Sequence, residues 1–177
     1  LWRNGGDVRV GTGGDGLVDI AGGGRAALNS IYIGRGSDLM FGTGAGTVTV
    51  HGTNSQLVCA ALAIGQLRAG VLTIADGGGV RVVGGKLTVG RSGDGEMHVI
   101  AGGRLEAGET VLGGESSAAS GSASVTVSGA GSQWINAGDL KLSNLSPASL
   151  AISAGAMVQN ANAFVGFGIG PSDGTAV

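Results

Sequence analysis

Proline, cysteine and aromatic residues are scarce in this chain, which has 2 Pro, 1 Cys and 3% aromatics among 177 residues. A single cysteine, Cys59, excludes an internal disulfide. Without a Gly-X-Y period or abundant proline, the 39 glycines do not indicate collagen. The charges are scattered and the net charge is −2, so nucleic acid and anionic membranes are not expected partners. No apolar run is long enough to span a membrane, and we expect no membrane insertion by this segment.

What the sequence does contain is a repeat. A short apolar segment ending in glycine recurs along the whole chain, and its final residue, here called the anchor, is first Gly11 and then Gly34. Successive anchors stand 23 to 31 residues apart. Such self-similarity is typical of stacked architectures, in which one unit cannot bury its apolar face without its neighbours. The segments are Val8–Gly11, Ile31–Gly34, Leu62–Gly65, Leu87–Gly90, Thr110–Gly113, Leu140–Ser143 and Ala163–Gly166.

Two further strand-like segments follow each anchor. The second alternates apolar and mostly polar residues, as in Thr47–Val50 and Val71–Ile74, which indicates a strand with one buried face. Its apolar positions should form two inward columns, one through Val48 and Leu72 and one through Val50 and Ile74. Glycine-rich corners then lead to a less regular third strand. These third strands are expected at 26–28, 57–59, 80–82, 105–107, 134–136 and 157–159.

The sequence therefore predicts an all-β fold, a parallel β-helix (solenoid) of about seven three-stranded coils. Residues 1–177 form a single segment of this β-helix. Trp2–Asp7 matches Trp134–Asp139 position by position, so we expect the chain to begin and end within repeats, as a fragment of a longer protein.

Particular segments carry a resemblance to a known family. Val10-Gly11 through Leu17–Gly23, and Gly46–Val50 with the later Gly131–Trp134, resemble the repeat of autotransporter (type V secretion) passenger domains and PEP-CTERM-associated surface proteins. The similarity spans essentially the whole chain. Leu57, where the repeat usually has Trp, and Ser143, which replaces an anchor glycine, depart from the pattern.

The resemblance implies a right-handed β-helix displayed outside a Gram-negative bacterium, with its outer-membrane anchor in another part of the precursor. It implies a structural or adhesive role, with a host cell-surface or matrix component, or another bacterium, as the partner. Two other functions remain open: a pure spacer whose binding site lies elsewhere, and a carbohydrate-processing β-helix. We expect no enzymatic activity in this segment, because its acidic residues are not gathered on one face, and we expect no cofactor.

Few residues suggest a chemical site. Cys59 is expected to be a buried side chain, and His98 a solvated residue in an outward row with Thr73 and Thr126. The two histidines stand in different coils, so no zinc site is expected. Asp15 and Asp94 each lie four residues after an anchor, a pattern that weakly resembles calcium-binding glycine-rich coils, although backbone preference alone favours Asp in such turns. The outward threonines do not form the unbroken array of an ice-binding surface.

Unequal coil lengths point to the binding residues. From the anchor to the inward aliphatic residue the spacing is 9 in four coils, but 16 from Gly34 to Val50 and 14 from Gly113 to Val127. The two insertions should project from the same corner of the coil, about 14 Å apart, with residues 167–173 as a possible third. Insertions gathered on one face of a repeat protein often form its binding face, although surface loops also tolerate added length without any function. The candidate binding residues are Arg35, Asp38, Met40, Phe41, Glu115, Ser116 and Ser117.

Overall fold

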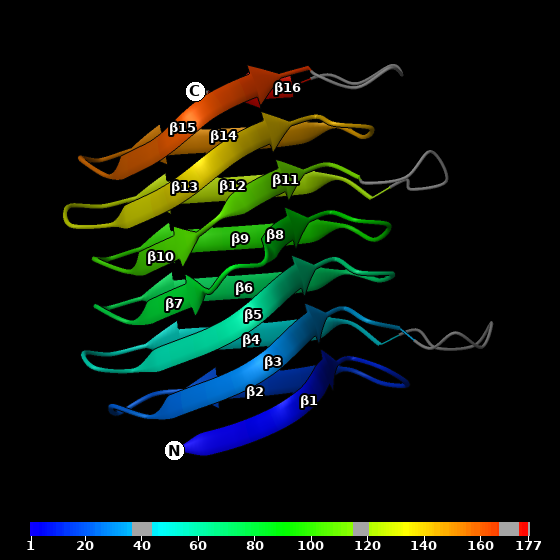
Figure 1. Cartoon of the computed structure of the whole chain (residues 1–177), viewed down its shortest axis with the longest axis vertical. Helices are drawn as coiled ribbons and strands as arrows, with labels where there is room; N and C mark the ends of the chain where they lie inside the picture. The colour runs from blue at the N-terminus through cyan, green and yellow to red at the C-terminus, as the bar shows by residue number, and fades with distance from the viewer. Residues whose placement is uncertain (37–43, 115–120, 167–173, 177) are drawn as a thin grey trace.

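The computed structural model describes residues 1–36, 44–114, 121–166 and 174–176, which form a stack of parallel β-strands without any helix (Figure 1). The strands are β1 (Trp2–Val10), β2 (Gly16–Ile20), β3 (Arg25–Ile33), β4 (Gly46–His51), β5 (Gln56–Ile64), β6 (Gly70–Ala75), β7 (Gly79–Val82), β8 (Lys86–Val89), β9 (Gly95–Ile100), β10 (Arg104–Ala107), β11 (Glu109–Leu112), β12 (Ala123–Ser128), β13 (Gln133–Leu142), β14 (Ala148–Ser153), β15 (Met157–Val165) and β16 (Gly174–Ala176).

Two sheets run along the stack. Within the described residues, the second segments of the coils form a seven-stranded sheet in the order β16-β14-β12-β9-β6-β4-β2. The first and third segments form a nine-stranded sheet. Each strand pairs with its equivalent in the next coil, so residues at equivalent positions lie directly above one another: Val48 faces Val18 on one side and Leu72 on the other.

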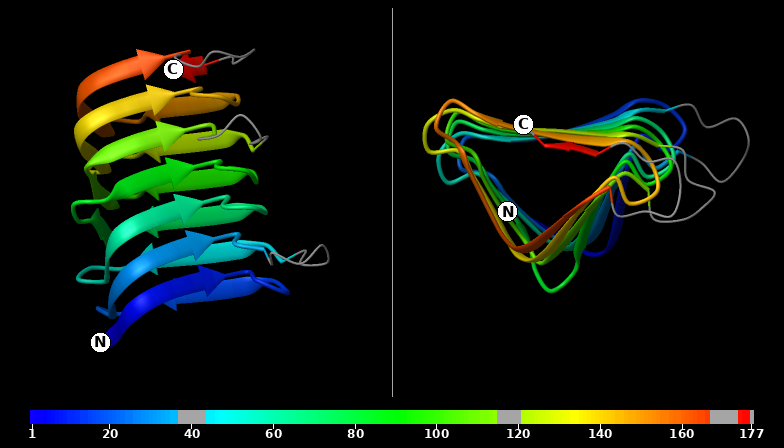
Figure 2. Two further views of the ribbon diagram at one scale, coloured as in Figure 1. Left: turned by 45° about the vertical axis from the view of Figure 1, so that its right-hand side comes forward. Right: turned by 90° about the horizontal axis from the view of Figure 1, so that it is seen from above.

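The coil is right-handed, as the resemblance implies. In Figure 1 the front strands run from left to right and the sheet behind them returns, while the chain climbs from β1 to β16. From above, the stack has a triangular outline (Figure 2). The seven anchors each follow the end of a strand, and the stack has about six turns, so the expected number of about seven coils is one too many.

The three-stranded description of each coil also needs a correction. In most coils the third strand does not end at a corner but bends and continues into the first strand of the next coil, as in β3 and β13. Strand pairing is present on both sides of the bend, and a register shift between Asn136 and Asp139 accommodates the change of direction. Separate third and first strands remain in the two coils that contain β7 with β8 and β10 with β11.

The interior consists of the predicted aliphatic columns. Val48, Leu72, Val50 and Ile74 are fully buried, which confirms the alternation of inward and outward residues. The column through Val50 and Ile74 continues to Ile152. This residue is 39% exposed because β16 pairs with β14 only as far as Leu150. Leu57, the residue that replaces a tryptophan in the repeat pattern, is also fully buried.

The anchor glycines are required by both backbone angle and space. All six described anchor glycines have φ between +67° and +79°. A Cβ on Gly90 would lie 2.3 Å from the carbonyl oxygen of Ser122, in the next coil. Ser143, the exception, adopts φ +54° and its Oγ accepts a hydrogen bond of 2.9 Å from the Ala148 backbone N–H. This local bond offsets part of the strain that a non-glycine residue incurs there.

Candidate functional site

The turns that follow the anchors are stacked at one corner of the triangle, and the described ends of both long segments lie there (Figure 2). The backbone N–H of Gly36 donates to Gly11 O at 2.9 Å, and that of Gly114 donates to Gly90 O at 2.7 Å. The described start of each long segment is thus hydrogen-bonded to the anchor glycine of the coil below it.

The returning end of each long segment is held by an aspartate of the preceding coil. Asp15 Oδ1 accepts from the Ala45 backbone N–H at 2.9 Å. Asp94 Oδ1 accepts from the backbone N–H of Ser122 at 3.0 Å and from its hydroxyl at 2.7 Å. These bonds, first from the backbone and then from the hydroxyl, lower the pKa of Asp94. The two aspartates therefore have a structural role in this geometry, because each bonds to the chain of the neighbouring coil.

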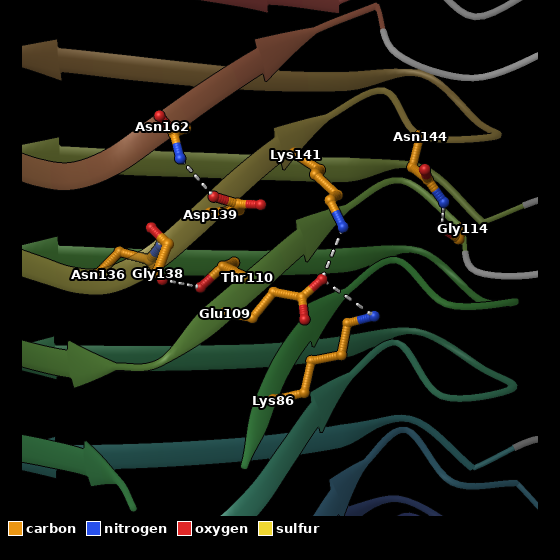
Figure 3. A network of polar contacts seen from close by, with 10 residues as sticks. All are labelled: Lys86, Glu109, Thr110, Gly114, Asn136, Gly138, Asp139, Lys141, Asn144 and Asn162. Atoms are coloured by element: carbon orange, nitrogen blue, oxygen red, sulfur yellow. Dashed lines mark hydrogen bonds and ion pairs between the residues drawn. The ribbon is translucent and has the colours of Figure 1, made fainter. Parts of the chain in front are cut away.

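The second long segment is also held from above. Asn144, in the turn between β13 and β14, donates from Nδ2 to the Gly114 carbonyl oxygen at 3.0 Å (Figure 3). Gly121 lies so close to Gly93 of the coil below that a Cβ there would be 2.3 Å from Gly93 O. Both ends of this segment are consequently fixed by neighbouring turns.

Of the predicted binding residues, Arg35 lies within the described structure. It is half-buried beside the first long segment, and its backbone N–H donates to Val10 O at 3.2 Å. Asp38, Met40 and Phe41, and the trio Glu115, Ser116 and Ser117, lie outside the described residues.

A charged cluster crosses the outward face of the first strands. Glu109 Oε1 lies 2.8 Å from Lys141 Nζ and 3.8 Å from Lys86 Nζ, and the three residues come from adjacent coils (Figure 3). The hydrogen bond from Lys141 is the main cause that lowers the pKa of Glu109, and the same bond raises the pKa of Lys141. The cluster ties three coils together on the surface.

A small trough lies next to this cluster. Outward positions on the first strands carry Tyr32 on β3, Ala61 and Ala63 on β5, and Thr88 on β8, with Tyr32, Ala63 and Thr88 in one register row. Among the described first strands, β5 is the one whose two outward residues are both alanine. The gap between the larger neighbours is a pocket of about 170 Å³.

The turn end of this trough holds Gln66 and Arg91. The Gln66 side chain is 8% exposed, and its Oε1 has no hydrogen-bond partner. Lys86 and Arg91 add two cationic groups to the lining. The sequence analysis missed this site, because its residues come from three coils, spread over 59 positions from Tyr32 to Arg91, and become neighbours only through the coil register. The one signal in the sequence was the presence of small residues, Ala61 and Ala63, at both outward positions of β5.

A wider groove of about 380 Å³ crosses β5, β7 and β10. Arg81 and Glu106 line it and form an ion pair of 3.2 Å with each other. Both side chains are more than half exposed, so this ion pair contributes little to stability, and Arg104 is a third charged residue in the lining.

The outer face of the seven-stranded sheet carries both histidines. His51 Nε2 lies 3.2 Å from Asp19 Oδ1, and His98 Nε2 lies 3.6 Å from Glu96 Oε2. His98 is aligned with Thr73 and Thr126, as predicted, and all three are half-buried on the outward side.

Cys59 lies in the core with 1% exposure, which confirms its predicted burial. Burial raises the pKa of its thiol to about 12.

Within the described ranges, no three His, Cys, Asp or Glu side chains are grouped so that they could hold a metal ion. No helix with the length and apolar character needed to cross a membrane occurs in the same residues.

Comparisons with known proteins add no further identification: no family model, curated protein or solved structure matches this chain.

Proposed function

We propose that this chain is the β-helical body of an adhesin displayed on the surface of a Gram-negative bacterium, and that the corner with the long segments is its binding face. The partner is a host cell-surface or matrix component, or another bacterium. The observation that carries this proposal is that two long segments, three coils apart, depart from one corner and are held by equivalent aspartates, Asp15 and Asp94.

The physical support is the way in which the ends of these segments are fixed. A loop that merely tolerates extra length needs no specific bonds at its ends. Here Asp15 and Asp94 bond to the returning chain, and Asn144 bonds to the outgoing end of the second segment. A binding surface benefits from such fixed ends, because less conformational entropy is lost when a partner binds.

Display outside the cell is proposed from the resemblance to autotransporter passengers. The interior suits this location, since it is stabilised by stacked aliphatic columns and contains no disulfide. In this proposal an outer-membrane barrel outside the present residues anchors the chain.

A spacer remains the second candidate, and the surface charges favour it. Glu109 is shared by Lys86 and Lys141, and Arg81 pairs with Glu106, so many described charges on two faces are matched within the chain. Such a surface offers few unmatched groups to a partner.

A binding assay separates the two functions. The purified chain is coated on beads and tested against cultured host cells, matrix proteins and beads that carry the same chain. The variant that lacks residues 37–43 retains four residues between Gly34 and Gly46, as the native chain has between Gly65 and Gly70. We expect saturable attachment by the native chain and a loss of at least tenfold in the variant. A spacer would show no saturable attachment by either protein, and equal attachment by both would remove the first long segment from the binding face.

A further inference from the structure

The outer face of the third strands is the basic side of the molecule. These strands form the side of the triangle opposite the corner at which the long segments begin (Figure 2). Their outward positions, from β1 to β15, carry four of the ten cationic residues of the chain and one of its twelve acidic residues. The cations are Arg3, Arg25, Arg81 and Arg104, and the acid is Glu106. The fold thus gathers on one face charges that are scattered along the sequence.

Two of these arginines stand in one register row. Arg25 pairs with Gln56, Gln56 with Gly79, and Gly79 with Arg104, so the two cations lie at the ends of a row that crosses four adjacent coils. Both arginines are exposed. Within the described residues, neither guanidinium has a hydrogen-bond or ion-pair partner. Their charges are therefore available to a partner molecule.

Gly79 opens a gap in this row. The groove of about 380 Å³ lies here, with Gln56 and Arg104 on its two sides and Val58 in its lining. The backbone does not require a glycine at this position: its φ lies outside the left-handed region, and a Cβ would meet only Ser55 O, at 4.0 Å. Glycine weakens a strand, and in a regular strand it often marks the close approach of a ligand. The gap leaves room for one side chain of a partner.

The spacing of the row matches an extended peptide. Arg25 and Arg104 are three strand spacings apart, or about 14 Å. In an extended chain, residues i and i+4 point to the same side and are also about 14 Å apart. A peptide that runs along the row can therefore place one carboxylate at each guanidinium, and residue i+2 then points toward the gap at Gly79. The Gln56 amide, which both donates and accepts, can bond to the peptide backbone.

Glu106 restricts the kind of anion that fits. It lies two residues after Arg104, on the same side of β10. A polymer with a negative charge on every unit, such as a nucleic acid or a highly sulfated polysaccharide, would bring like charges against this carboxylate, which disfavours such a partner. A peptide with two separated carboxylates avoids the repulsion.

We propose that the row of Arg25, Gln56, Gly79 and Arg104 binds an extended acidic segment of a partner protein. Two carboxylates of this segment, four residues apart, lie at the two arginines, and the side chain between them enters the gap at Gly79.

Three peptides test the spacing, each N-acetylated, C-amidated and titrated into ¹⁵N-labelled chain at pH 7 and low salt. TDTVTDT has the two aspartates four residues apart; TDTVDTT has the same charge, but its aspartates point to opposite sides of an extended chain; TNTVTNT is neutral. The amide signals of Gln56, Gly79 and Arg104 report binding. The first peptide should give saturable shifts, with the second at least threefold and the third at least tenfold weaker.

Three outcomes would overturn the proposal. Equal affinity for the first two peptides would reduce the row to a cationic patch without selectivity for spacing. The absence of saturable shifts with the first peptide would remove the site. Tighter binding of a glucuronate hexasaccharide than of the first peptide would assign the face to an acidic polysaccharide instead of a protein.

Variants test the row itself. Arg25→Gln and Arg104→Gln should each weaken binding of the first peptide about threefold, and the double variant about tenfold, because exposed ion pairs are individually weak. Arg9→Gln removes the same charge from the outward side of the first strands and should leave affinity unchanged. Gly79→Leu fills the gap and should weaken binding at least threefold while the urea midpoint is retained. Unchanged affinity in the double variant would contradict the assignment even if Gly79→Leu fails to fold.

This surface is separate from the proposed binding face at the long segments. A chain without residues 37–43 should still bind the first peptide, and the double variant of Arg25 and Arg104 should still attach to the partner of that corner. Loss of peptide binding in the shortened chain, with its fold retained, would contradict the location of the site on the third strands.

Discussion

The interior columns of this molecule are nearly uniform from coil to coil, whereas the turns at the corner vary in length. In the seven-stranded sheet, register is continuous from β2 to β16, and equivalent inward positions are almost all aliphatic. At the corner, the chain between anchor and next strand varies from four residues after Gly65 to eleven after Gly34. Each inward side chain contacts coils above and below, so a change there disturbs three coils. The turns project outward, and they can lengthen while the stack stays in register.

The largest effect is expected from a charge in an interior column. Ile74→Asp places a carboxylate in a fully buried position between Val50 and Val99, at a cost of more than about 4 kcal/mol. Thr73→Asp, at the adjacent outward position, should change the free energy of unfolding by less than about 0.5 kcal/mol. Urea unfolding followed by circular dichroism measures both. Similar losses in the two variants would show that inward and outward positions had been confused.

A smaller effect should distinguish a glycine that meets the next coil from one that does not. Gly90 and Gly84 both have φ +72°, but only at Gly90 would a Cβ meet backbone, 2.3 Å from Ser122 O; at Gly84 nothing lies within 4 Å. Gly84→Ala should cost about 1 kcal/mol, because it strains the backbone alone. Gly90→Ala should cost roughly 3 kcal/mol or more, because the next coil must also move. Equal costs would mean that the close approach between coils has no energetic weight.

The same comparison explains which features of the structure could be predicted from the sequence and which could not. The inward columns could be predicted because period-2 alternation is local and each repeat restates it. The continuation of third strands into first strands could not be predicted. The residues from Leu28 to Ile31 lie within one bent strand, but their local sequence does not distinguish a bend inside a strand from a corner between two strands. The trough was missed for another reason: Tyr32, Gln66 and Lys86 become neighbours only when the register between coils is known. The roles of Asp15 and Asp94 likewise depend on residues 28 to 30 positions further along the chain.

The contact of Asp94 with the corner should appear in the pH dependence of stability. Because the folded-state pKa of Asp94 is lowered, its stabilising contribution is complete above the unfolded value of about 3.9 and is lost as pH falls through the folded value. The difference in urea midpoint between the native chain and Asp94→Asn should be largest above pH 5 and shrink toward pH 2. Glu109, whose pKa is also lowered, contributes equally to both proteins and cancels in this comparison. A difference that is constant from pH 2 to pH 6 would refute the role of the ionised carboxylate.

The smallest perturbation of structure comes from labelling the interior thiol. With a pKa of about 12, Cys59 has a thiolate fraction of about one part in 10⁴ at pH 8, and the side chain is buried. Its alkylation by iodoacetamide should therefore require unfolding and follow the urea transition. A cysteine introduced by Ser124→Cys, at an exposed outward position of β12, should react without denaturant. Rapid reaction of Cys59 in the folded chain would show that the interior opens locally.

The most direct test asks whether the stability of the stack is independent of the binding by the corner. It measures hydrogen exchange in a chain with both long segments shortened. Removal of residues 37–43 and 115–119 leaves four residues between each anchor and the next strand, as in the short coils. We predict that amide protection in β4 and β12 stays at the native level, while attachment to the partner falls at least tenfold in the same preparation. Loss of protection in β4 and β12, or full attachment by the shortened chain, would contradict the account.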